Sequence, residues 1–192
     1  MKQDEIRRKL IDGTIHVIAK DGLDKATTKQ ISTVTSINEV YIYRCFNDKA
    51  HMFAVTFESL EQELISKMLQ HLPIILMKDI DFKTRCQLYF NVIWKFLLGN
   101  RDKSLTYIRY YFSTYYNLYS SETHDKLYEP VIEKFSEGFL EGANVHMILT
   151  HILMVMLTFA VKVFEGSLPD NDDTAEHIFR ILYVSVSQYL KN

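Results

Sequence analysis

The sequence predicts an all-α protein in which an N-terminal three-helix head, carrying a helix-turn-helix, joins a larger helical bundle. We expect about nine helices in total. Two observations predict this class. Only 6 Gly and 3 Pro punctuate the 192 residues, which is too few for a β protein with many turns. Long stretches also repeat apolar residues at helical spacing between short polar breaks.

Charge is distributed unevenly along the chain. Residues 1–50 carry a net charge of +2, and residues 51–192 carry a net charge of −4. A mildly basic head on an acidic body suits a protein that meets phosphate at one end only. The two cysteines, Cys45 and Cys86, fit neither a disulfide framework nor a metal-binding motif, so we expect a reducing, cytoplasmic location.

We expect no signal peptide and no membrane association. The first ten residues mix charges and lack the apolar run of a signal peptide. The most apolar stretch, residues 146–164, is long enough to cross a bilayer but includes two His, two Thr and one Lys. We interpret it as a buried helix.

The first helix is predicted over residues 4–20, and a glycine ends it. Ile6, Leu10, Val17 and Ile18 form an apolar stripe at helical spacing. Gly22 can then take the left-handed conformation that closes a helix.

A helix-turn-helix is predicted next. Thr27 and Gln30 form a capping box that opens a short helix over residues 28–34. Residues 35–37 form the turn, and Asn38 is the N-cap of a second helix that ends at Arg44 or Cys45. The expected inner face, which fixes the angle between the helices, consists of Ile31, Val34, Ile37, Ile42 and Phe46.

Residues 5–60 resemble the DNA-binding head of the TetR family of bacterial transcriptional regulators. The resemblance rests on ISTVTSINEVYIYRCFNDK at residues 31–49, preceded by DGLDKATT at residues 21–28. Ile31, Ile37, Tyr43, Phe46 and Lys49 match the spaced family pattern. The resemblance implies a DNA-binding domain over residues 1–48 and a ligand-binding and dimerisation domain over residues 49–192.

The resemblance also implies which residues contact DNA. Thr28 and Lys29 would meet phosphate; Glu39, Val40 and Tyr41 would face bases; Tyr43 and Lys49 would clamp the backbone. The full implied set is Thr28, Lys29, Asn38, Glu39, Val40, Tyr41, Tyr43, Arg44 and Lys49.

Two positions depart from the family pattern. Thr35-Ser36 replaces the usual Ala-Gly of the turn, and serine lacks the freedom of glycine at positive φ. We therefore expect a turn that is either strained, at a cost of about 1 kcal/mol, or differently shaped. At the start of the second helix, Val40 replaces a small residue commonly seen there, and Glu39 brings a carboxylate to the groove, where it can accept from cytosine N4 but repels phosphate.

The remaining helices are predicted near residues 49–70, 81–98, 101–119, 122–141, 145–165 and 173–190. The helix at 145–165 is apolar nearly all round, and the one at 173–190 carries a strong apolar stripe. Such helices need more cover than a chain of this size supplies. We therefore expect a homodimer that pairs through residues 145–165 and 173–190.

Aromatic residues are concentrated in residues 89–119. Tyr107, Tyr111 and Tyr115 fall on one line of a helix, and such walls suit a pocket for a flat or apolar ligand. An aromatic-rich core is the alternative, and His151 is either a polar contact in the pocket or a satisfied core histidine. The expected ligand-binding set is Tyr89, Phe90, Trp94, Tyr107, Tyr111, Phe112, Tyr115 and His151.

These patterns favour a ligand-responsive transcription regulator over an enzyme. The seven His lack metal-ligand spacing, and no catalytic triad or phosphate loop stands out, so we expect no cofactor and no metal. The expected function is a repressor that is released from a palindromic operator in double-stranded DNA by a small, largely apolar or aromatic effector. The alternative is a helical interaction protein, or a regulator without an effector, whose head engages a protein partner.

Overall fold

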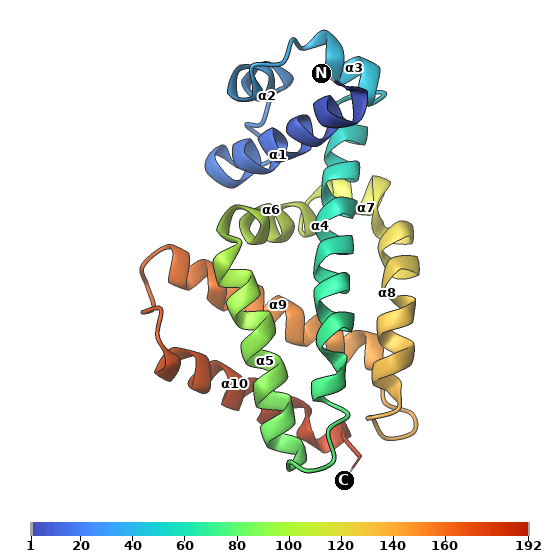
Figure 1. Ribbon diagram of the computed structural model, residues 1–192, viewed down its shortest axis with the longest axis vertical. Coiled ribbons are helices and arrows are strands. Elements are labelled where there is room, and N and C mark those ends of the chain that lie inside the picture. Colours follow the sequence, from blue (N-terminus) through green and yellow to red (C-terminus); the bar gives the residue numbers. More distant parts are fainter. Residues whose placement is uncertain (1, 192) are drawn as a thin grey trace. The chain divides into compact units, whose positions relative to one another are not determined.

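The computed structural model describes residues 2–191, and in this range the chain is helical without a β-strand. The described range holds ten α-helices and two short 3₁₀ helices (Figure 1). In chain order they are α1 (Gln3–Asp21), α2 (Thr28–Thr35), α3 (Val40–Cys45), α4 (Lys49–His71), η1 (Leu72–Ile74), α5 (Phe82–Gly99), α6 (Arg101–Tyr111), α7 (Thr114–Tyr119), α8 (Ser121–Ser136), α9 (Val145–Phe164), α10 (Asp172–Val186) and η2 (Ser187–Tyr189).

The helices form two compact units. The first contains the residues up to Glu63 together with Asp102–Lys126. The second contains Leu64–Arg101 and the residues from Leu127 onward. The unit that holds the head therefore also includes α6, α7 and the first part of α4.

The expected all-α class is confirmed, but the helix predicted over residues 101–119 is two helices. Ser113 separates α6 from α7 and caps the second. Its hydroxyl donates to the Tyr110 carbonyl at 2.6 Å and accepts from the Tyr116 N–H at 3.4 Å. The sequence predicted one helix here because the helical spacing of the tyrosines continues across the break at Ser113.

The head packs around fully buried aliphatic and aromatic residues. Leu10 and Ile18 of α1, Ile31 of α2, Ile42 of α3 and Phe46 are all inaccessible to solvent or nearly so. Figure 1 shows α1, α2 and α3 gathered at the start of α4. The predicted inner face is correct at Ile31, Ile37, Ile42 and Phe46.

Val34 is the exception, because half of its surface is exposed (50%). The inner position next to Ile31 belongs instead to Thr35, whose methyl group faces Gly13 of α1. A Cβ built on Gly13 would lie 2.2 Å from Thr35 Cγ2. The side of α2 that meets α1 is therefore set by the i, i+4 pair, and Val34, one residue before Thr35, turns outward.

Helix α6 braces the C-terminal half of α1 within the first unit. Thr106 Oγ1 donates to the Ile15 carbonyl at 3.0 Å, and Arg109 Nη1 donates to the carbonyls of Ile18 at 2.5 Å and Ala19 at 2.7 Å. The last carbonyls of a helix have no partner within the helix. Arg109 supplies a donor to the Ala19 carbonyl at this end of α1, and Thr106 bonds to the Ile15 carbonyl one turn earlier, so both side chains tie α6 to α1.

Candidate nucleic-acid interface and ligand cavity

The turn of the helix-turn-helix contains a serine in the left-handed conformation. Ser36 has φ 55° and ψ 28°, and it is the single non-glycine residue at positive φ in the described range. Of the two outcomes expected for serine in place of glycine, a strained turn or a differently shaped one, the structure shows the positive φ of the strained turn. Ser32 Oγ donates to the Ile37 carbonyl at 2.7 Å, and this bond spans the turn and fixes the direction in which α3 begins.

The capping box that precedes α2 is also confirmed. The Thr27 hydroxyl accepts from the Gln30 N–H at 3.2 Å, and the Gln30 side chain accepts from the Thr27 N–H at 2.9 Å. Helix α3 begins at Val40, two residues after the predicted N-cap. Asn38 Oδ1 nevertheless accepts from the Val40 N–H at 2.9 Å, so it satisfies a donor at the start of the helix.

Glu39 and Thr28 bond to each other. The Thr28 hydroxyl donates to the Glu39 carboxylate, and both side chains are half-buried. The family resemblance gave these residues separate roles, with Thr28 on phosphate and Glu39 on a base. In the structure the Thr28 hydroxyl and the Glu39 carboxylate are hydrogen-bonded to each other, and this bond holds the carboxylate against the start of α2.

Three apolar or aromatic side chains of α3 face solvent. Val40 is 54% exposed, Tyr41 is 37% exposed and Tyr43 is 58% exposed. The Arg44 guanidinium lies 5.3 Å from the centre of the Tyr41 ring. Helix α3 thus exposes one aliphatic and two aromatic side chains, with the cation of Arg44 in its last turn.

Some basic residues of the head are exposed, and others form hydrogen bonds within the head. Lys29 is exposed on α2. Lys49 Nζ donates to the Ala26 carbonyl at 3.4 Å and lies 5.3 Å from the centre of the Phe53 ring. Arg7 Nη1 donates to the Cys45 carbonyl at 2.8 Å at the end of α3. Lys49 and Arg7 therefore also fix the head in place.

The second unit encloses an apolar cavity of about 320 Å³. This volume lies at the lower end of the range for small-molecule sites. The lining residues, mostly aliphatic and aromatic, are Met68, Leu72, Ile75, Leu76, Phe82, Cys86, Tyr89, Phe90, Ile93, Lys134, Phe135, Glu137, Gly138, Phe139, Leu149, Ile152, Leu153, Met156, Phe179, Leu182, Tyr183, Val186 and Leu190.

Two polar groups of the cavity wall, those of Tyr89 and Cys86, are uncharged at neutral pH. The Tyr89 hydroxyl donates to the Met68 carbonyl at 3.0 Å, and burial raises the pKa of Tyr89. Burial also raises the pKa of the Cys86 thiol to about 11, so it stays protonated. The charged lining residues are Lys134 and Glu137; the Lys134 side chain is exposed, as is that of Glu137.

The structure brings together only two residues of the expected ligand-binding set in this cavity, Tyr89 and Phe90. Trp94 is buried and stacks on Phe90, with ring centres 6.0 Å apart. Phe112 is 71% exposed. His151 is exposed and forms a 3.1 Å hydrogen bond to Ser185 Oγ, so it is not the core histidine considered above.

The tyrosines at residues 107–116 form an aromatic cluster of their own in the first unit. Phe57 of α4 is its centre, with ring centres 4.9 Å from Tyr107 and 4.6 Å from Tyr110. Tyr111 lies 4.5 Å from Tyr116, and Tyr115 packs on Phe53 at 5.5 Å. These contacts match the aromatic-rich core that was the alternative to a pocket.

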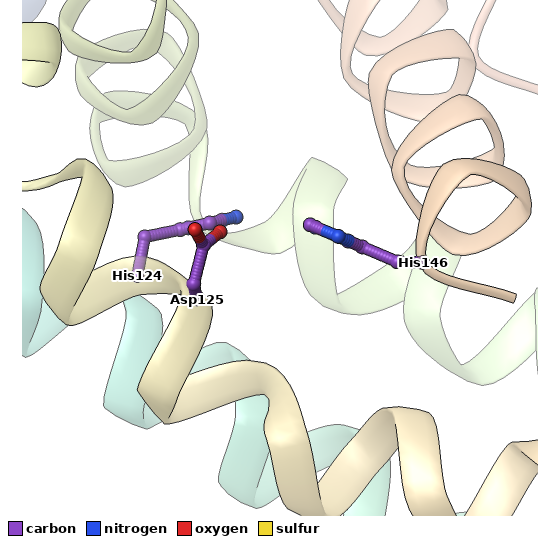
Figure 2. A group of neighbouring side chains, drawn as sticks. All are labelled: His124, Asp125 and His146. Carbon is purple, nitrogen blue, oxygen red and sulfur yellow. The ribbon is translucent and has the colours of Figure 1, made fainter. Parts of the chain in front are cut away.

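A buried acid–histidine pair lies beside this cluster and was not anticipated. The Glu61 carboxylate of α4 is hydrogen-bonded to His124 Nδ1 of α8, and both side chains are almost completely buried. Burial raises the pKa of Glu61, partly offset by the hydrogen bond from His124. Glu61 Oε2 has no hydrogen-bond partner among the described residues. Figure 2 shows His124 with Asp125, the next residue of α8, and His146 near the start of α9.

Helices α9 and α10 of the second unit leave apolar side chains in solvent. Met147 is 68% exposed on α9, and Ile181 and Val184 of α10 are 56% and 69% exposed. Within the described residues, α9 is the one helix whose length and composition would allow it to cross a membrane, and only 33% of its most apolar window is buried.

Solved structures with the same fold include proteins described as transcription regulators of the TetR family. One from Marinobacter aquaeolei VT8 has 14% identity and a TM-score of 0.72, with 95% of both chains covered. One from Shewanella sp. PV-4, described as putative, has 11% identity and a TM-score of 0.74, covering 96% of this chain and 98% of that one. A third, the multidrug binding protein EbrR complexed with imidazole, has 12% identity and a TM-score of 0.61, with 92% and 93% covered.

No protein-family model and no curated protein sequence matches the chain. The chain therefore has the fold of these regulators at a level of identity that establishes the fold alone.

Proposed function

We propose that this protein is a ligand-responsive, DNA-binding transcription regulator of the TetR family, which acts as a homodimeric repressor. The observation that carries the proposal is the head: its inner residues are buried, while α3 presents Val40, Tyr41 and Tyr43 to solvent. A helix-turn-helix needs this division between a packed inner face and a free outer face that enters the major groove.

In the proposed complex, α3 lies in the major groove and basic and hydroxyl side chains contact phosphate. Lys29, Tyr43, Arg44 and Lys49 are the candidates for phosphate contact. Arg and Lys supply the charge-assisted part of such contacts, and the Tyr hydroxyl supplies a neutral donor. The net charge of +2 on residues 1–50 favours approach of this end to DNA.

The proposed homodimer pairs through α9 and α10. Exposed Met147, Ile181 and Val184 give these helices an apolar surface that a second copy would cover. Two heads would then meet successive major grooves about 34–36 Å apart, which requires a palindromic operator. Changing Val184→Arg should convert the dimer to a monomer of 22.6 kDa in light scattering. The matched change Leu118→Arg, at an equally exposed residue of α7, should leave a dimer.

The proposed effector is small and uncharged, and it binds in the apolar cavity of the second unit. Apart from the exposed Lys134 and Glu137, the lining residues carry no charge, and a buried ion without a partner is strongly disfavoured. The solved neighbour described as a multidrug binding protein is consistent with a ligand site on this fold. Effector binding would release the operator to the extent that the effector prefers the DNA-free conformation.

Selection of binding sites from random double-stranded DNA by the full-length protein tests the proposal. We expect enrichment of a palindrome and two chains per duplex. Tyr43→Phe, which removes one exposed hydroxyl, should weaken binding severalfold by removing a phosphate contact. The control Tyr119→Phe, with a similarly exposed ring on α7, should bind normally. Failure to enrich any DNA would favour the alternative, in which the head engages a protein.

A further inference from the structure

The exposed side chains at the start of α3 are apolar or aromatic, whereas a helix that contacts bases normally carries paired hydrogen-bond donors or acceptors there. Val40 is the first residue of α3, and this residue is 54% exposed. Tyr41 follows it and is held beside the Arg44 guanidinium. Recognition helices place their N-terminal residues on base edges. The residue best placed to meet a base is therefore one that cannot form a hydrogen bond through its side chain.

The polar side chains around Val40 are already engaged within the head. Glu39 accepts the Thr28 hydroxyl, which holds its carboxylate at the start of α2. Asn38 Oδ1 accepts from the Val40 N–H at 2.9 Å. A bidentate contact of asparagine with adenine needs the amide to lie in the plane of the base, whereas this bond ties the Asn38 amide oxygen to the backbone at the start of α3.

Arg44 is the remaining side chain of α3 that can make a bidentate base contact. It lies in the last turn of the helix, four residues after Val40, with its guanidinium at the Tyr41 ring. This position favours the phosphate backbone over a base edge, in line with the exposed Lys29 and the net positive charge of residues 1–50. The charges complement the duplex, while the apolar surface is left for the bases.

We propose that this head recognises the C5-methyl group of thymine in the major groove through Val40, with Tyr41 closing the side of the contact. Thymine is the only base that presents a methyl group there. Cytosine presents an amino donor at the neighbouring ring position, and a donor buried against valine would lose its water without gaining a partner. The preferred half-site therefore has an A·T pair opposite Val40. This inference rests on the proposed DNA-binding function.

Replacing thymine by deoxyuridine tests the proposal directly, because it removes the methyl group and preserves base pairing. The operator is first selected from random DNA, and each thymine of the half-site is then replaced in both halves. We expect one thymine whose replacement weakens binding of the wild-type protein about fourfold per half-site, the value for one buried methyl group. Replacing that thymine by cytosine should weaken binding further, and 5-methylcytosine should recover part of the loss.

Two valine variants locate the contact. Val40→Ala should bind the thymine and deoxyuridine operators equally. The control Val34→Ala removes a valine of the same head that is 50% exposed on α2, and it should keep the discrimination. Circular dichroism spectra and melting temperatures that match the wild type establish that both variants are folded.

The outcomes separate this inference from the function on which it rests. A selected operator whose affinity is unchanged by every deoxyuridine replacement overturns methyl recognition and leaves DNA binding intact. Discrimination that persists in Val40→Ala overturns the assignment to Val40. If selection enriches no DNA at all, the proposed function fails, and methyl recognition fails with it.

Discussion

The contact between Gly13 of α1 and Thr35 of α2 predicts a substitution whose effect reverses sign with its background. In the middle of a helix, glycine is less favourable than alanine by about 1 kcal/mol, so helix propensity by itself would make Gly13→Ala stabilising. The new Cβ would, however, lie 2.2 Å from Thr35 Cγ2, whereas carbon atoms prefer about 3.5–4.0 Å. Overpacking of this kind costs about 1–3 kcal/mol.

Thr35 has little freedom to move away from such a methyl group. Its Oγ1 donates to the Ile31 carbonyl at 2.7 Å, and rotation of the side chain would break that bond. We therefore predict that Gly13→Ala lowers the free energy of unfolding by about 1–2 kcal/mol in the wild-type background. In a Thr35→Ala background the nearest atoms are the Cβ of residue 35 at 3.7 Å and Ile31 Cγ2 at 3.8 Å, which are ordinary contacts. There the same change should stabilise by about 1 kcal/mol.

Urea unfolding of the four proteins, followed by circular dichroism, measures the coupling between Gly13 and Thr35. We expect a coupling free energy of about 2–3 kcal/mol, within the range for residues in direct contact. Gly99→Ala is the control, because a Cβ there meets no atom within 4 Å. Its effect should be the same in both backgrounds. If Gly13→Ala has the same sign with and without the Thr35 methyl group, the close packing of α1 on α2 is refuted.

Three further predictions concern the turn, the buried pair and the cavity. Ser36→Gly should raise the melting temperature by about 2–4 °C, because glycine adopts φ 55° without the steric cost of about 1 kcal/mol; no increase would contradict strain at this turn. Burial raises the pKa of Glu61 above its ordinary 4.5, so its stabilising contribution is present below pH 4.5 and is lost as pH rises through the folded-state pKa. Glu61→Gln should therefore gain stability relative to the wild type as pH rises above 4.5 in a series of urea titrations, and a difference that is flat with pH would refute this. In fluorescence titrations, N-phenyl-1-naphthylamine should bind the cavity at least about tenfold more tightly than its sulfonated analogue, because the cavity lining is largely uncharged. Leu153→Trp should abolish this binding by filling the cavity. Equal affinity for the two probes would contradict an uncharged site.

The head was largely predictable because its signals are local. The capping box of Thr27 and Gln30 depends on residues three positions apart and occurs as expected, and the positive φ of Ser36 is one of the two turn geometries expected for serine in place of glycine. Val34 was not predictable in the same way. In an eight-residue helix either Val34 (i+3) or Thr35 (i+4) can face inward beside Ile31. Which of them does so depends on the close approach of α1 to α2 at Gly13, which lies far away in the sequence.

The cavity was less predictable than the head, because its walls have the composition of an ordinary core. Residues such as Ile93, Leu153 and Met156 line it, and helical spacing alone does not distinguish a side chain that faces a void from one that faces a neighbour. The tyrosines near residue 110 attracted attention as a ligand wall, yet they pack around Phe57. The pair of Glu61 and His124 joins residues 63 positions apart and left no sequence signal.

The salt dependence of binding to the selected palindrome tests the central claim most directly. A dimer whose two heads each place several basic and hydroxyl groups on phosphate releases condensed counterions when it binds. The slope of log K against log salt concentration should then be about −0.9 for each phosphate neutralised, and we predict a slope of about −4 or steeper. A slope near zero, with affinity unchanged between low and physiological salt, would contradict a head that binds DNA.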